Sequence, residues 1–158
     1  SGIINPTVLQ PSVNLPLGAY IPESYINDLP QRLTVYQRLT RLVSYEEIPA
    51  IERELRDRFG LIPQPLENLL FVIQIKMLAR DSHVESVYKD KDQIVLRFGQ
   101  SVGGARNVLQ KQLSNRAIVG DRLVKMRMKD DWSVTLPCVL ERLIKFQEEL
   151  KSLAAKAY

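Results

Sequence analysis

The chain contains one histidine and one cysteine, His83 and Cys138, and this limits the nucleophilic and metal chemistry it could perform. Every Ser-His-Asp or Cys-His arrangement would need His83 as its base, and His83 stands in a polar segment before a predicted strand. One His and one Cys cannot complete a tetrahedral metal site. We therefore expect a surface or structural role for His83, a buried apolar role for Cys138, and no metal or cofactor.

The sequence also lacks the patterns of phosphate and carboxylate chemistry. A nucleotide hydrolase needs a G-x-x-x-x-G-K-[ST] loop to bind phosphates, and Gly103-Gly104 is not followed by Lys and then Ser or Thr. Adjacent acidic residues such as Glu46 and Glu47 point to different faces of a helix or strand, unlike the converging carboxylates of a hydrolase. The chain is therefore not expected to be an enzyme.

Basic residues gather in the second half of the chain. Residues 1–79 include 7 Lys and Arg against 8 Asp and Glu, a net charge of −1, and residues 80–158 include 15 against 10, a net charge of +5. Lys125, Arg127 and Lys129 form the best basic patch, but no aromatic residue interleaves with them to stack on bases. A solvated sheet face is favoured, and direct DNA binding by this domain is not expected. A stand-alone basic nucleic-acid-binding module remains the alternative function.

The spacing of apolar residues predicts the elements that position these side chains. A period near 3.6 residues predicts five helices. Ser44 and Glu47 fit a capping box at the start of the second helix, and Gly60 fits a left-handed cap at its end. The helices are expected at about 29–43, from 44 to the cap at Gly60, from the Pro63–Pro65 turn to about 80, around 108–113, and from Pro137 to about 150.

A period of two residues predicts three strands, at 84–88 and 93–98 as a hairpin and at 122–128 with one apolar and one basic face. The predicted fold is α+β, with about five helices packed with a small three-stranded antiparallel sheet. Residues 1–18 are rich in proline without a helical period, which predicts an extended lead-in or linker before a domain at 19–158.

No stretch of the sequence predicts a membrane span. The longest uninterrupted apolar stretch, Leu69–Ile73, has five residues. A bilayer span requires about 20. The start of the chain also lacks a basic segment followed by an apolar core and a small-residue cleavage site. We therefore expect a cytoplasmic protein with no membrane partner.

Glu54 and Asp57 are the most informative pair of charges. The apolar stripe of the second helix places both carboxylates toward solvent, and residues three apart are neighbours on a helix surface. Two interpretations remain open. The first is a solvated face on which arginines of the same helix are the partners, namely Arg53, Arg56 and Arg58. The second is a pair that awaits Arg or Lys from another protein surface.

Three ordered blocks carry a family resemblance: LPLGAYIPESYI at Leu15–Ile26, RLTVYQRL at Arg32–Leu39, and ELRDRFG at Glu54–Gly60. Together with the helix entry at Pro63–Leu70 and the final segment Trp132–Leu150, they resemble the C-terminal domain of bacterial transcription-repair coupling factor. The resemblance covers about residues 13–150, and an ordered set of blocks is more specific than any single motif.

The resemblance implies a function for the chain. In that family the whole protein is a DNA translocase that displaces stalled RNA polymerase and recruits nucleotide excision repair, with its motor upstream of this domain. The C-terminal domain docks on the N-terminal damage-recognition module and masks the binding surface for the excision-repair ATPase subunit. The resemblance implies that Glu54 and Asp57 form the docking face. It also implies a bacterial cytoplasmic protein, in which RNA polymerase is only an indirect partner of this domain.

Overall fold

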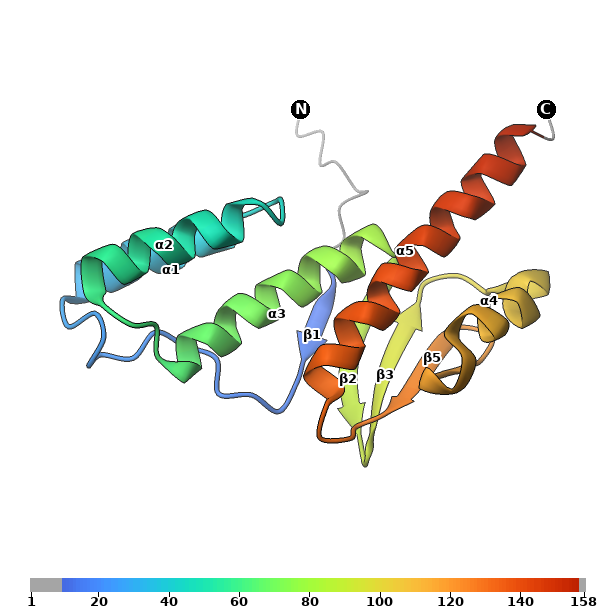
Figure 1. Cartoon of the computed structure of the whole chain (residues 1–158), viewed down its shortest axis with the longest axis horizontal. Coiled ribbons are helices and arrows are strands. Elements are labelled where there is room, and N and C mark those ends of the chain that lie inside the picture. The colour runs from blue at the N-terminus through green and yellow to red at the C-terminus, as the bar shows by residue number, and fades with distance from the viewer. Residues whose placement is uncertain (1–9, 157–158) are drawn as a thin grey trace, which may run out of the picture. The chain divides into compact units, whose positions relative to one another are not determined.

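Five α-helices and one five-stranded sheet make up residues 10–156, the part of the chain that the computed structural model describes (Figure 1). The chain divides into two units, one at Pro16–Met77 and one that combines Leu78 onward with the segment before Pro16. Within the described residues, none of the helices has the length and apolarity needed to cross a membrane.

The unit at Pro16–Met77 is helical. It contains α1 (Leu29–Thr40), α2 (Glu47–Phe59) and most of α3 (Gln64–Asp81). The Asp28 side chain caps α1 by accepting a hydrogen bond from the backbone N–H of Gln31. Gly60 ends α2 at a φ of 92°, in a region that favours glycine.

The capping box before α2 forms only in part, and α2 begins later than predicted. The Glu47 carboxylate accepts hydrogen bonds from the backbone N–H groups of Val43 and Ser44, as a capping box requires. The residue that caps α2 is nevertheless Glu46, with no side-chain hydrogen bond to the helix. The predicted start at Ser44 and the predicted end of α1 at residue 43 are both displaced by three residues.

An apolar core holds the helical unit together. Leu55 of α2 and Leu66 of α3 are fully buried, and partly buried aromatic residues pack around them. Eight buried residues form this core: Ile21, Ile26, Val35, Leu39, Ile51, Leu55, Leu66 and Leu70. Residues from the segment before α1 therefore share one core with all three helices.

The second unit contains the sheet, whose strand order is β1-β2-β3-β5-β4. The predicted hairpin is confirmed as β2 (Val84–Asp90) and β3 (Gln93–Phe98), and β5 (Leu123–Arg127) corresponds to the predicted third strand. The prediction of three antiparallel strands is wrong. Strand β1 (Ser12–Asn14) pairs parallel to β2 inside the predicted lead-in, and β4 (Ile118–Val119) pairs antiparallel to β5.

One face of the sheet is buried. A row of apolar residues crosses all five strands in register: Val13, Val87, Leu96, Val124 and Val119. Helix α5 (Trp132–Lys156) lies across the sheet in Figure 1 and contributes five buried residues. Helix α4 (Arg106–Leu113), between the short 3-10 turns Gly103–Ala105 and Ser114–Arg116, packs against β4 and α5.

Two expectations about α5 are corrected by the structure. The helix begins at Trp132, so Pro137 lies inside it and not at its start. The turn before Pro137 is stabilised by backbone bonds from the N–H groups of Val134 and Thr135 to the carbonyl of Asp131. Cys138 is exposed, because the buried stripe of the helix is formed by its neighbours Leu136, Val139 and Leu140.

Leu55→Ala tests the core of the helical unit. Leu55 is fully buried, so the truncation should lower the free energy of unfolding by about 2–5 kcal/mol through reduced transfer energy and an unfilled cavity. Leu61 is 85% exposed and is the matched control, for which Leu61→Ala should change stability by less than about 0.5 kcal/mol. Urea denaturation measures both, and equal losses would contradict the assignment of the core.

Candidate docking surfaces

The Glu54 carboxylate is paired within its own unit. It accepts a hydrogen bond from Arg38 of α1, with a distance of 2.5 Å between Nη2 and Oε2. Arg58, one turn further along α2, lies 3.8 Å from the other carboxylate oxygen. All three side chains are between 39% and 47% exposed. Glu54 therefore forms a partly screened bridge between α1 and α2. The interpretation with partners on the same helix predicted Arg58 but not Arg38.

This pairing changes the acidity of both partners. The hydrogen bond from Arg38 lowers the pKa of the Glu54 carboxyl, and the charges of Arg38 and Arg58 act in the same direction. The same hydrogen bond raises the pKa of Arg38. The carboxylate form of Glu54 is thus the one that the folded unit stabilises.

Asp57 differs from Glu54 in its surroundings. Its side chain is exposed, and none of the ion pairs or side-chain hydrogen bonds found among residues 10–156 involves it. The predicted pair is therefore one carboxylate with a partner in the same unit and one available to another molecule. Of the two, Asp57 has the stronger capacity to bind an incoming Arg or Lys.

The three sequence blocks that carry the resemblance meet in this unit. The Tyr25 hydroxyl donates to the backbone carbonyls of Leu55 and Gly60 at the end of α2, at 3.0 and 2.8 Å. The Tyr25 and Phe59 rings are 5.8 Å apart, and the Arg58 guanidinium lies over the Phe59 ring at 4.8 Å. These contacts fix the end of α2, and with it the position of Asp57.

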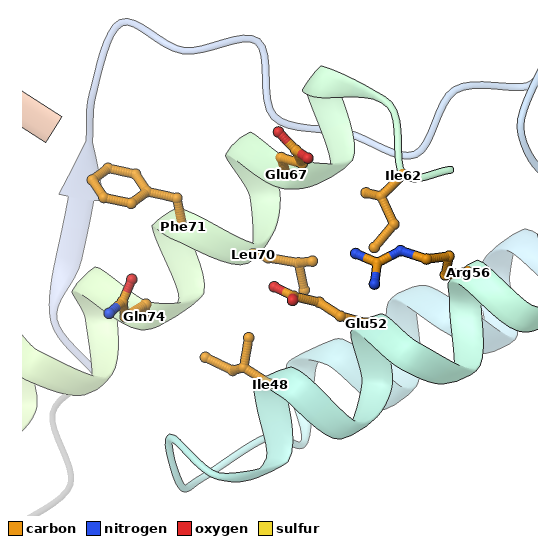
Figure 2. Close-up of a pocket in the computed structure, with 8 residues that line it drawn as sticks. All are labelled: Ile48, Glu52, Arg56, Ile62, Glu67, Leu70, Phe71 and Gln74. Carbon is orange, nitrogen blue, oxygen red and sulfur yellow. The ribbon is translucent and has the colours of Figure 1, made fainter. Parts of the chain in front are cut away.

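The opposite flank of α2 forms a small pocket with α3 (Figure 2). Its volume is about 220 Å³, and Ile62 and Leu70 contribute apolar surface. In Figure 2 the carboxylate of Glu52 projects toward α3 and the guanidinium of Arg56 lies beside Ile62. Neither Glu54 nor Asp57 lines this pocket, whose charged groups are of both signs. The acidic pair and the pocket are therefore separate surfaces of the same helix.

The predicted basic residues lie in the sheet unit. Lys125 and Arg127 belong to β5 and share one face of the sheet, while Lys129 lies beyond the end of that strand. The ion pairs found among the described residues include none of the three. Arg97 of β3, which no sequence pattern singled out, lies on the same face because it pairs with Leu123. Only the strand register reveals this neighbour.

His83 lines a cavity of about 620 Å³ in the sheet unit. Phe98, Phe146 and Leu150 supply apolar walls, and Arg80 and Lys151 are the other basic residues there. Cys138 does not line this cavity. Across residues 10–156, no three His, Cys, Asp or Glu residues lie where they could share a metal ion. The cavity thus does not combine His83 with the thiol that a Cys-His arrangement would require.

The comparison with protein families decides what kind of domain this is. The family model of the TRCF domain matches residues 15–106, more than half of the chain. The chain belongs to the TRCF domain family. The matched residues include all three blocks of the resemblance, the helical unit, and the β2-β3 hairpin.

Relatives of this TRCF domain are named transcription-repair-coupling factors. The relative from Rickettsia prowazekii is 32% identical over 110 residues, which cover 67% of this chain and 10% of the relative. The relative from Bacillus subtilis is 36% identical over 88 residues, which cover 56% of this chain and 8% of the relative. The chain therefore spans about a tenth or less of the length of these curated relatives. It corresponds to the TRCF domain and not to an ATPase motor, so it is not an enzyme.

A solved structure shares the fold of the TRCF domain described above. The crystal structure of the C-terminal domain of a transcription-repair coupling factor matches with a TM-score of 0.73 and 20% sequence identity. The match covers 89% of this chain and 97% of that chain. The mixed α+β architecture, with helices on one sheet, is therefore a known arrangement.

A double-mutant cycle on Arg38 and Glu54 tests the bridge between α1 and α2. We expect Glu54→Gln and Arg38→Gln to show a coupling of about 0.5 kcal/mol at neutral pH, a value limited by solvent screening of exposed pairs. The folded pKa of Glu54 lies below its unfolded value, so the stabilisation is complete above the unfolded pKa and is lost as the pH falls through the folded pKa.

Asp57→Asn is the control for this cycle. Asp57 makes no side-chain ion pair within the unit, so its neutralisation should change the free energy of unfolding by less than about 0.5 kcal/mol. Urea denaturation at a series of pH values measures all variants. A coupling between Arg38 and Glu54 that persists below the folded pKa of Glu54 would exclude the charged bridge.

Proposed function

We propose that this TRCF domain is a non-catalytic, autoinhibitory domain of a transcription-coupled DNA repair translocase. The domain docks on the N-terminal damage-recognition module of its own parent protein. In the docked state it masks the surface of that module that binds the excision-repair ATPase subunit. RNA polymerase is involved indirectly, because translocation of the parent protein on DNA opens the docked state.

The observation that carries this proposal is the exposed carboxylate of Asp57 on a rigid helix end. Tyr25 and Gly60 hold the end of α2, so the backbone that carries Asp57 loses little conformational entropy on binding. Glu54, beside it, contributes a second carboxylate that Arg38 partly neutralises. This surface is complementary to exposed Arg or Lys residues of a partner.

A charged, partly exposed contact suits a reversible docking domain. An intramolecular partner acts at a high effective concentration, so a modest interface is enough to close it. The coupling free energy of a switch is typically about 1–3 kcal/mol. An exposed ion pair contributes about 0.2–1 kcal/mol, so a few such pairs together reach this range. A large apolar interface would resist opening, whereas a charged one can be released by a competing ligand.

The docking role predicts that Asp57→Lys abolishes or strongly weakens binding of this chain to the separate N-terminal module. Like charges brought together at an interface cost several kcal/mol, so we expect an affinity loss of about tenfold or more. Isothermal titration calorimetry of the two purified parts measures the loss. Asp57 is the preferred position, because Glu54→Lys would also place a cation beside Arg38 and Arg58.

Glu148→Lys is the matched control for this experiment. Glu148 is an exposed residue of α5 in the other unit, and its reversal changes the net charge by the same amount. The control should bind the N-terminal module with unchanged affinity. Equal losses for Asp57→Lys and Glu148→Lys would mean that net charge and not the α2 surface drives binding. Unchanged binding by Asp57→Lys would remove Asp57 from the docking face.

A further inference from the structure

The face of the sheet opposite the buried one is open and carries cations. Three rows of residues cross it in register, and the central row contains Asn14, Tyr88, Val95, Lys125 and Ile118. A neighbouring row places Arg97 between Ser86 and Leu123, and the third places Arg127 beside Gln93. In contrast to the buried face, this face is dominated by polar and charged side chains.

Tyr88 is the feature that sequence spacing did not place. It lies far from β5 in the sequence, yet Val95 alone separates it from Lys125 in the sheet. The Arg97 guanidinium donates a hydrogen bond to the Tyr88 hydroxyl at 3.3 Å, which restrains the ring. Val95 is only 1% exposed, so the accessible surface between the two strands comes from Tyr88 and Lys125, which are both half-buried. The aromatic ring and the cations therefore form one continuous surface.

Two of the three cations of this surface, Lys125 and Arg127, make no ion pair among the described residues. Two carboxylates border it: Asp90, in the row of Arg127, and Glu85, at the irregularity between Val84 and Ser86. Three cations against two bordering carboxylates leave a positive surface with its excess on β5. At the β4 edge, Ile118 is 66% exposed and adds apolar surface beside Lys125.

We propose that this open sheet face, formed by Tyr88, Arg97, Lys125 and Arg127, binds single-stranded nucleic acid. Cations along a surface attract the phosphate backbone, and an aromatic side chain offers a platform on which a base stacks regardless of its identity. Sheets that present aromatic residues among basic ones on an uncovered face bind single strands in this way. A duplex, whose bases are already stacked, gains nothing from the tyrosine.

This proposal is independent of the docking function. All four residues belong to the sheet unit, and none of them lies on α2. It also revises the expectation that the domain does not bind DNA directly. That expectation depended on the absence of an aromatic residue near the basic strand, and the register of β2, β3 and β5 supplies one.

Fluorescence anisotropy of the whole chain with a labelled oligo-dT of about ten nucleotides tests the proposal, since sheet-based single-strand sites cover roughly 4–16 nucleotides. Tyr88→Leu should weaken binding about tenfold because the base can no longer stack, and Tyr88→Phe should keep it, because the ring remains. The duplex of the same length should bind more weakly than the single strand. Circular dichroism verifies that each variant is folded.

The salt dependence measures how many phosphates the surface neutralises. Replacing Lys125 and Arg127 by Gln should make the plot of log affinity against log salt less steep by roughly 1.4, about 0.7 for each phosphate that is no longer neutralised. Lys111→Gln is the matched control, since Lys111 is an exposed residue of α4, which packs against β4 and α5 and not on the open face. This control should keep the slope of the unaltered chain.

Several outcomes would overturn the proposal. One is an absence of binding to the single strand at low salt. Another is equal binding by Tyr88→Leu and the unaltered chain, which would reduce the surface to charge alone. A third is displacement of the oligonucleotide by polyglutamate at the same charge concentration, which would identify an acidic protein surface as the partner.

Discussion

Burial of the apolar stripe of α2 determines how the helical unit presents its charges. Ile51 and Leu55 must face the core that α1, α3 and the preceding segment share, and this requirement fixes the rotation of the helix. Glu54 then falls on the flank toward α1, where Arg38 meets it, and Asp57 falls on the side exposed to solvent. The Tyr25 hydroxyl fixes the same helix end through two backbone carbonyls.

The proposed docking function follows from the different surroundings of these two carboxylates. Glu54 stabilises the unit internally, and a screened surface pair of this kind contributes little free energy. Asp57 is exposed, and the proposal assigns it to a cation of the partner surface. A single well-positioned carboxylate with a partly neutralised neighbour gives a contact that is specific in charge and weak enough to open, as a regulatory domain requires.

The sequence predicted the helical unit well because its elements have strong local signals. The apolar stripe of α2 and the glycine at position 60 both act within a few residues of chain. The sheet was predicted less completely. Strands β1 and β4 have three and two residues, too few for an alternating pattern, and they exist only because β2 and β5 offer them edges.

Contacts between distant residues were equally hidden from local patterns. No spacing rule connects Arg38 with Glu54 or Tyr88 with Lys125, because the first pair depends on helix packing and the second on strand register. Pro137 misled the prediction for a different reason. Its backbone geometry favours a helix start, but the turn before it is already helical, closed by hydrogen bonds from the backbone N–H groups of Val134 and Thr135 to the carbonyl of Asp131.

The central claim is that the domain and the excision-repair ATPase subunit use the same surface of the N-terminal module. The most direct measurement is a competition experiment, in which this chain is titrated into a preformed complex of that module with the ATPase subunit. The account predicts that the chain displaces the subunit, and that Asp57→Lys displaces it at least about tenfold less effectively. A stable ternary complex of the three proteins would contradict it.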